Sequence, residues 1–432
     1  RALCAAATIE DALTRCYYQE GDSSSTLLDE LGEESDLARA AGEGQTEDLM
    51  DVANRAPIVK LVNTIFYQAV AARASDIHVE PYERSVRVRF RIDGVLHERF
   101  NPPKQYLGAL VSRLKIMAHL NIAETRLPQD GRSKIKIGEK EIDIRVSTIP
   151  TSGGERVVLR LLDKRGRRFN LDELGFAPEA RERFRRLTRV SHGIVLLTGP
   201  TGSGKTTTLY GALSEINTEQ RNILTAEDPI EYVLPGVGQM QVHPKIGLTF
   251  ASCLRHILRQ DPNVIMVGEI RDGETAEIAI QAALTGHLVF STLHTNDSAS
   301  AFTRLLDMGV EAYLVSSSII AVMAQRLVRV ICPRCKASHP AGADERLVLG
   351  AQAAPEALLW RGQGCAHCMD TGYHGRTGIC EMLVVDDEAR EQIMKRLAAN
   401  VIKQAAVRKG MTTLRDDGVR KALAGETTLD EV

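Results

Sequence analysis

The sequence lacks the long apolar runs and the charge imbalance that mark several classes of protein. No stretch approaches 18 consecutive apolar residues, which argues against a transmembrane helix. The chain has 54 Lys and Arg against 56 Asp and Glu, so a net charge of −2 gives no general attraction to nucleic acid. Residues 1–12 also lack the basic start and apolar core of a secretory signal. What remains is the composition of an ordinary globular protein, long enough at 432 residues for two to four domains.

The first part of the chain is acidic and poor in periodic apolar positions. Arg1 rather than methionine stands first, so we expect the chain to begin inside a longer gene product. Residues 1–54 hold 13 Asp or Glu and 3 Lys or Arg, and clusters of Gly, Ser and Glu interrupt any periodicity. We interpret this part as an acidic segment and linker that belong to a partial domain.

A P-loop pattern stands in the middle of the chain, in GPTGSGKT at Gly199–Thr206. The apolar run Ile194–Leu197 before it predicts a buried strand, and Thr207–Ile216 after it predicts a helix. A strand, a glycine-rich turn and a helix N-terminus form an anion site, because backbone N–H groups and the helix dipole point at the phosphates. We expect Lys205 to reach the β- and γ-phosphates of a nucleoside triphosphate and Thr206 to place its hydroxyl on Mg²⁺.

Polar residues close the apolar segments that surround the P-loop. Such segments alternate with helical ones from residue 193 onward, which is typical of a parallel sheet with ligands at the carboxyl ends of its strands. Glu227 and Asp228 close one segment, Glu269 follows the next, and His287 and His294 flank a third. Phosphoryl transfer needs a carboxylate for Mg²⁺, a group that orients the attacking water, and cations. Either Glu227 or Glu269 could orient the water, and a structural role is the alternative for both histidines.

The segment before the P-loop predicts a compact α+β domain over residues 55–160. Pro57 opens an amphipathic helix. In Val86–Ile92 apolar residues alternate with arginines, which predicts a strand with one core face and a row of guanidiniums on the other. Asp93-Gly94 then supplies a tight turn, and Ile135–Val146 predicts a second hairpin.

A basic stretch joins this domain to the P-loop domain at residues 161–189. Between Lys164 and Arg189 there are nine Lys or Arg and four Asp or Glu. We interpret it as a solvated linker and helix face; a surface for an acidic partner or anionic lipid is the alternative.

Four of the eight cysteines form two pairs, with 29 residues between the pairs. They are Cys332, Cys335, Cys365 and Cys368. Disulfides are rare in the cytosol, where an ATP-dependent enzyme belongs, so metal ligation is the better interpretation. Four thiolates close a tetrahedral Zn²⁺ site with no open position, which makes the site structural. Disulfides and a catalytic zinc are the less favoured alternatives. The remaining cysteines are scattered.

Arginines from outside the P-loop domain usually complete the active sites of ring ATPases. Arg255 and Arg259 lie four residues apart, and we expect them on one helical face. Arg145 and Arg160 fall in predicted strands of the preceding domain. A surface salt bridge is the alternative for each of the four.

Several motifs closely resemble the secretion ATPase superfamily over about residues 55–430. Those after the P-loop are TAEDPIEY (Thr225–Tyr232), PKIGLTFA (Pro244–Ala251), LRQDPNVIMVGEIRD (Leu258–Asp272), TGHLVFSTLHTND (Thr285–Asp297) and QRLVR (Gln325–Arg329). Those before it are ASDIHVEP (Ala74–Pro81), RFRIDGVLHE (Arg89–Glu98) and RLPQDGR (Arg126–Arg132). Within the superfamily the chain is most similar to the motor ATPases of type II secretion, with type IV pilus extension ATPases as near relatives.

The resemblance implies an α/β fold with six segments. These are a partial N-terminal segment (1–54), a PAS-like α+β domain (55–160), a basic linker and helix (161–189), a RecA-like P-loop ATPase domain (190–330), a tetracysteine zinc subdomain (331–385) and a helical C-terminal region (386–432). It implies catalytic roles for Lys205, Glu227, Glu269 and His294, and Mg²⁺ ligation by Thr206 and Glu269. The implied nucleotide contacts are Gly199, Pro200, Thr201, Gly202, Ser203, Gly204, Lys205, Thr206, Thr207, Arg145, Arg160, Asp228, Arg255, Arg259 and His287.

The resemblance also implies a machine and its partners. We expect a homo-hexameric ATPase that uses ATP, Mg²⁺ and Zn²⁺ and drives pseudopilus assembly for protein export. It would lie at the cytoplasmic face of the bacterial inner membrane, held there by membrane proteins of the secretion system that contact its N-terminal region. We expect no nucleic-acid partner. A type IV pilus or DNA-uptake motor is the first alternative, a nucleic-acid motor the second, and an assembly module with a vestigial P-loop the third.

Overall fold

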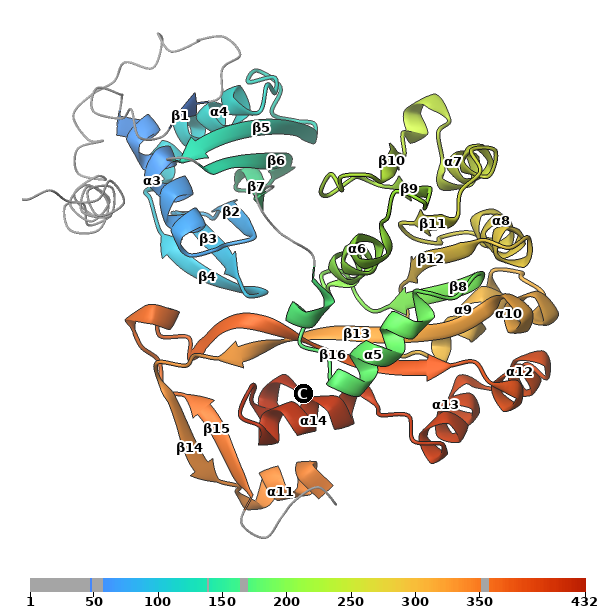
Figure 1. Ribbon diagram of the computed structural model, residues 1–432. Coiled ribbons are helices and arrows are strands. Elements are labelled where there is room, and N and C mark those ends of the chain that lie inside the picture. The colour runs from blue at the N-terminus through green and yellow to red at the C-terminus, as the bar shows by residue number, and fades with distance from the viewer. Residues whose placement is uncertain (1–46, 49–56, 138–139, 164–169, 351–356) are drawn as a thin grey trace, which may run out of the picture. The chain divides into compact units, whose positions relative to one another are not determined.

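The computed structural model describes residues 47–48, 57–137, 140–163, 170–350 and 357–432. Most of the predicted acidic segment, including Cys4 and Cys16, lies outside the described residues, as do Gly138 and Glu139 of the second predicted hairpin. The chain divides into two compact units, Arg1–Arg167 and Arg168–Val432 (Figure 1). None of the described helices has the length and apolar character needed to cross a bilayer.

The first unit is built on a seven-stranded sheet with the order β1-β5-β6-β7-β2-β3-β4. Its strands are β1 (Glu47–Asp48), β2 (Asp76–Pro81), β3 (Val86–Ile92), β4 (Val95–Phe100), β5 (Gln129–Ile137), β6 (Lys140–Thr151) and β7 (Gly154–Asp163). β1 pairs with β5 in parallel, and the other pairs are antiparallel. The two predicted hairpins form β3–β4 and β5–β6.

Helices α3 (Pro57–Ala71) and α4 (Leu107–Met117) pack against each other in this unit, and a short 3-10 turn, η1 (Lys104–Tyr106), leads into α4. Leu61, Phe66 and other apolar residues of α3 are buried at the spacing that the sequence predicts. The strand β3 shows the predicted alternation, because its apolar residues are buried and its arginines face ion-pair partners. Arg89 pairs with Glu80 of β2, and Arg91 pairs with Asp76.

The second unit is built on a mixed seven-stranded sheet with the order β10-β9-β11-β12-β8-β13-β16. Its strands are β8 (Gly193–Thr198), β9 (Ile223–Glu227), β10 (Gly238–Gln241), β11 (Val264–Val267), β12 (Leu288–Leu293), β13 (Ile319–Ile331) and β16 (Tyr373–Val384). All pairs are parallel except β13–β16. The strand before the P-loop, β8, therefore lies between β12 and β13, and the carboxyl ends of the parallel strands meet at one edge.

Helices cover both faces of this sheet. Residues 195 and 197 of β8 pack in one core with α5 (Pro178–Leu187) and α6 (Lys205–Ile216), while residues 194 and 196 pack in the other. The second core is closed by α7 (Phe250–Ile257), α8 (Gly273–Leu284), α9 (Ser300–Asp307), α10 (Ala312–Ser318), α12 (Asp387–Met394) and α13 (Ala399–Arg408). The short 3-10 turns η2 (Leu171–Glu173) and η3 (Pro244–Ile246) lie in connections. Burial on both faces explains the apolar runs of β8 and β11 and of the first half of β12, which continues with the buried Ser291 and Thr292.

The basic face of α5 is engaged by acidic residues of the same unit. Arg181 pairs with Asp172, and Arg185 pairs with both Asp172 and Glu215 of α6. These pairs agree with the interpretation of this stretch as a charged helix face.

A small arm leaves the main sheet between β13 and β16 (Figure 1). It contains the antiparallel pair β14 (Lys336–Pro340) and β15 (Leu358–Gly362), with α11 (Ala343–Leu349) and the 3-10 turn η5 (Ala366–Cys368). α14 (Leu414–Leu423) packs against β13, β15 and β16, and η6 (Leu429–Glu431) follows it. The predicted zinc segment 331–385 therefore does not stand apart, because β16, which forms its C-terminal end, belongs to the same sheet as the P-loop strand.

Candidate nucleotide site and cysteine cluster

The P-loop connects the end of β8 to the first turn of α6. Gly204 precedes α6 with φ +88°, and Gly199 follows β8 with φ +148°, where a Cβ atom would lie 2.5 Å from the carbonyl oxygen of Gln325. Both conformations favour glycine. The first N–H groups of a helix have no partner within the helix, so this turn can bind an anion.

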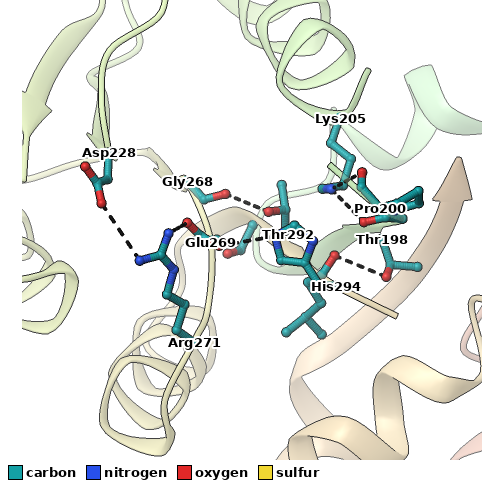
Figure 2. Close-up of polar contacts among 12 residues, drawn as sticks. Thr198, Pro200, Lys205, Asp228, Gly268, Glu269, Arg271, Thr292 and His294 are labelled. Atoms are coloured by element: carbon teal, nitrogen blue, oxygen red, sulfur yellow. Dashed lines mark hydrogen bonds and ion pairs between the residues drawn. The ribbon is translucent and has the colours of Figure 1, made fainter. Parts of the chain in front are cut away.

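The Lys205 side chain is hydrogen-bonded to the backbone of the loop itself. Its ammonium donates to the carbonyl oxygens of Gly199, at 2.7 Å, and Pro200, at 3.0 Å (Figure 2). Burial lowers the pKa of Lys205 to about 8, Glu269 opposes that shift, and Arg326 adds to it. The lysine is thus placed where phosphates would take over from backbone carbonyls as its acceptors.

The other residues of the loop divide into exposed and buried positions. Thr201, Gly202 and Thr206 are exposed, so the Thr206 hydroxyl at the start of α6 can reach a metal ion. Ser203 is buried, and its hydroxyl has no hydrogen-bond partner among the described residues. A buried hydroxyl without a partner, in a loop that can bind an anion, fits a site whose ligand supplies the missing polar atoms.

Glu269 lies at the carboxyl edge of the sheet and is held by an arginine and a histidine (Figure 2). Its Oε2 lies 3.3 Å from Nε2 of His294, and its Oε1 accepts a hydrogen bond from Arg271. Arg271 also lies 3.9 Å from Asp228. The Glu269 side chain is 15% exposed and interacts electrostatically with Lys205. The predicted group of Lys205, Asp228, Glu269 and His294 therefore gathers at one edge.

Glu227 is placed differently from the sequence expectation. It is 3% exposed, and both of its oxygens accept hydrogen bonds from protein side chains. Thr225 donates to Oε1 at 2.6 Å, Gln239 donates to the same atom at 2.9 Å, and Tyr210 of α6 donates to Oε2. Burial and the Glu227 charge raise the pKa of the Tyr210 phenol, so it remains a donor. The Glu227 carboxylate therefore links α6 to β9 and β10 through these hydrogen bonds.

His287 does not join the group at the P-loop. It precedes β12, whereas His294 follows it, and a six-residue strand separates the two by roughly 20 Å. The His287 ring contacts the carbonyl oxygen of Ala282 at 2.8 Å, and its own carbonyl oxygen accepts from Gly193. The strand between the two histidines therefore places His287 away from the P-loop of its own unit, and its contact with nucleotide stays a prediction.

The four predicted arginines fall into two pairs. Arg255 lies in α7 and pairs with Glu274. α7 ends at Ile257, so Arg259 lies outside the helix, where it contacts His256 at 2.6 Å. The expectation of one shared helical face is therefore wrong, because the helix ends after two turns. Arg145 and Arg160 are direct cross-strand partners on β6 and β7 of the first unit.

Arg145 and Arg160 line an open pocket of about 390 Å³ within the first unit. The other lining residues are Asp130, Gly131, Arg132, Val146, Ser147 and Val158. Arg160 also pairs with Asp76 at 3.0 Å. Their predicted contact with nucleotide remains a prediction.

The four paired cysteines converge on one point. Their Sγ atoms all lie within 4.8 Å of one another, and Cys332 lies 3.8 Å from Cys365, as Cys335 does from Cys368. A tetrahedral ion with Zn–S bonds of about 2.3 Å requires S···S separations of about 3.8 Å. A disulfide requires about 2.05 Å. The geometry thus fits the predicted zinc site and not the disulfide alternative.

The cluster lies at the base of the arm. Cys332 follows β13, Cys335 precedes β14, Cys365 follows β15 and Cys368 precedes β16. Gly362 and Gly372 approach so closely there that a Cβ on Gly362 would meet the Gly372 carbonyl oxygen at 1.9 Å. A metal ion at this point would join the four strand ends that enter and leave the arm.

Comparison with known proteins decides the family. The family model described as Type II/IV secretion system protein matches residues 51–432. The chain belongs to this family. The type II secretion system protein E of Aeromonas hydrophila is 52% identical to it over 424 residues, which cover 98% of this chain and 84% of that protein. The type IV pilus assembly ATPase PilB of Myxococcus xanthus is 48% identical over 431 residues, which cover 98% and 76%.

A solved relative supports the same assignment. The pilus retraction motor PilT, whose crystal structure contains ADP, is 26% identical to this chain, with a TM-score of 0.56. The match covers 85% of this chain and 94% of the PilT chain. Membership in the family confirms the predicted recognition and the predicted class of enzyme, an ATP hydrolase of the secretion ATPase superfamily.

Sequence reasoning missed three residues around the two acids. Arg271 contacts Glu269, and Tyr210 and Gln239 hold Glu227. Arg271 could have been found as the only cation within two residues of the predicted Mg²⁺ acid. Tyr210 and Gln239 carry no such signal, because they meet Glu227 only through the pairing of β9 with β10 and the packing of α6.

Proposed function

We propose that this chain is the ATPase of a type II secretion system and works as a homo-hexamer that drives pseudopilus assembly and protein export. The observation that carries this proposal is the group of Lys205, Glu269 and His294 at the mouth of the P-loop, in a chain about half identical to type II secretion proteins along nearly its whole length. The second unit is assigned to the RecA-like fold and the first to a PAS-like domain.

The residues at the P-loop divide the work of phosphoryl transfer. Lys205 contacts the terminal phosphates, and Thr206 and Glu269 hold the magnesium ion, which offsets the charge on the phosphates. Glu269 also orients the attacking water, and the half-exposed His294 holds its carboxylate in place at 3.3 Å. Glu227 takes no part in this step, because its oxygens are occupied and buried.

The pKa of Lys205 predicts how ATP affinity changes with pH. Below about pH 8 the lysine is already protonated, so phosphate binding takes up no proton there. Above about pH 8 each binding event must protonate it, so the affinity falls as pH rises, by up to about tenfold per unit. ATP titrations between pH 7 and pH 10 measure this slope. In Lys205→Arg the guanidinium stays charged and the slope should vanish; a slope equal to that of the parent would contradict the assignment.

Arg145 and Arg160 complete the active site from the first unit, either within a chain or across the subunit boundary. This part of the proposal is tested by ATP turnover per protomer over a protein dilution series, with Lys205→Ala as the inactive control. A specific activity that rises steeply with concentration supports sites completed between subunits. A flat, appreciable activity would restrict the role of both arginines to their own chain and remove the case for a hexamer.

The four cysteines hold a structural Zn²⁺ ion. Four thiolates leave no open position for substrate, so the ion would stabilise the arm and supply no chemistry. His367 stacks on His374 with ring centroids 4.3 Å apart and is not among the four convergent ligands.

The proposed role in type II secretion implies partners at the membrane. We assign the chain to the cytoplasmic face of the bacterial inner membrane, held there by membrane proteins of the secretion system that bind its N-terminal region. A type IV pilus motor is the second candidate, which the 48% identity to PilB favours. Co-purification with the cytoplasmic part of a secretion-system membrane protein would support the first candidate, and co-purification with the corresponding pilus protein would support the second.

A further inference from the structure

Arg326 of β13 lies beside the P-loop and is not among the predicted site residues. β13 pairs with β8 in parallel, and the last paired residues are Ala324 and Thr198. Arg326 therefore follows where the P-loop begins. Its Nη1 lies 3.2 Å from the position of a Cβ on Gly199, so the guanidinium contacts the first residue of the loop.

The hydrogen bonds of Arg326 go to uncharged acceptors. Its Nη2 donates to the carbonyl oxygen of Asn296 at 3.0 Å, and Nη1 lies 3.5 Å from that of Gln325. No carboxylate of the residues that the structure describes forms an ion pair with it. Other arginines of the unit, such as Arg185 and Arg329, do form such pairs. A half-buried guanidinium held only by carbonyls keeps its charge available for an anion.

Arg326 and Lys205 flank the same residue of the P-loop. The Lys205 ammonium donates to the carbonyl oxygen of Gly199 at 2.7 Å, and the Arg326 guanidinium lies against the Cα side of the same glycine. Two neighbouring cations at one loop repel each other, and an anion bound between them removes that repulsion. Among the described residues, Glu269 is the carboxylate whose charge acts on Lys205.

We propose that Arg326 is a second phosphate-contacting cation of the P-loop, and that it binds the terminal phosphate of the nucleoside triphosphate held by its own chain. This inference rests on the proposed ATP site. Lys205 marks the β/γ end of a P-loop ligand, and Arg326 lies beside Lys205 against Gly199. A planar guanidinium offers two parallel N–H donors to phosphate oxygens, and exchanging the Asn296 carbonyl for a phosphate oxygen would use them.

The test compares ATP with ADP in the full chain. We expect Arg326→Gln to weaken binding of a non-hydrolysable ATP analogue by about 10- to 100-fold and of ADP by less than about threefold, because only the triphosphate reaches the guanidinium. Arg326→Lys keeps the charge and should recover part of the loss. Arg408→Gln, an exposed position in α13, is the matched control and should bind both nucleotides like the parent. Isothermal titration calorimetry measures all four proteins.

The outcomes separate this inference from the proposed function. Equal losses for both nucleotides, or no loss for either, in a folded Arg326→Gln would overturn the assignment to the terminal phosphate while the parent still binds ATP. Failure of the parent chain to bind ATP would overturn the proposed function and this inference with it. If Arg326→Gln does not fold, the ratio of ATP to ADP affinity in Arg326→Lys decides: a ratio equal to the parent's, with Arg408→Gln also unchanged, rejects the contact.

Discussion

Glu269→Gln should lower ATP turnover by about 10²- to 10⁴-fold while the chain stays folded, because a positioned acid contributes about this much to proton transfer and metal binding. The glutamine keeps the size of Glu269 but loses the charge that faces Lys205, Arg271 and His294. Steady-state kinetics give kcat, and urea unfolding shows that stability is retained.

Glu227→Gln is the matched comparison, and its main effect should be on stability. The substitution turns charge-assisted hydrogen bonds from Tyr210, Thr225 and Gln239 into neutral ones and leaves one buried donor without an acceptor. We expect a loss of about 1.5–3 kcal/mol in the free energy of unfolding, with kcat reduced far less than in Glu269→Gln. If Glu227→Gln instead lost turnover as strongly as Glu269→Gln at unchanged stability, the water-orienting role would belong to Glu227.

Removal of the metal from the cysteine cluster should produce the largest loss of stability in the second unit. The purified chain is expected to hold close to one zinc ion, and Cys365→Ser should lose it. Loss of a structural metal belongs to the small class of changes that cost more than about 4 kcal/mol. The strand ends at the base of the arm would then be linked only by hydrogen bonds such as those from Cys332 to Gly372 and from Gln363 to Cys335, among the described residues. Metal analysis and thermal unfolding with and without a chelator measure both effects.

The control for this experiment is a buried cysteine outside the cluster. Cys380 of β16 is 4% exposed, and Cys380→Ala should keep the zinc content of the parent even if it costs some packing. Zinc content and melting temperature both unchanged in Cys365→Ser would reject the structural site. Zinc lost equally from Cys380→Ala would show that the metal depends on the fold of β16 and not on the four thiolates.

Much of the second unit could be predicted because its strands are buried on both faces. Apolar runs located β8, β11 and β12 to within one residue, and the helix predicted from Thr207 after the P-loop begins two residues earlier, at Lys205. The two hairpins of the first unit were equally accessible, since alternation and turn residues mark them. The convergence of the four cysteines could also be predicted, because two Cys-x-x-Cys pairs have the spacing of metal ligands.

The surroundings of the acidic residues and histidines could not be predicted, because they depend on the direction in which side chains point at the strand ends. Glu227 and Glu269 both close an apolar strand, so their sequence patterns are alike. The pleat of β9 places Glu227 with Thr225 on the face covered by α6, whereas Glu269 lies two residues beyond β11 and faces the P-loop. His287 and His294 likewise differ only by the strand between them. A pattern gives positions along the chain, but partners from β10 and α6 decide their surroundings.

β13 carries a mechanical consequence for the arm. One strand runs from Gln325, whose side chain accepts a hydrogen bond from Thr208 of α6, to Ile331, directly before Cys332. The path from Arg326 to Cys332 is six residues, about 20 Å, and it is extended apart from one irregularity in its pairing with β16, between Arg329 and Ile331. An extended chain has little slack, so a pull on the arm is transmitted toward the P-loop with only this irregularity to straighten first. A force applied to the arm would therefore act along β13 on Arg326, and through it on Gly199 of the P-loop.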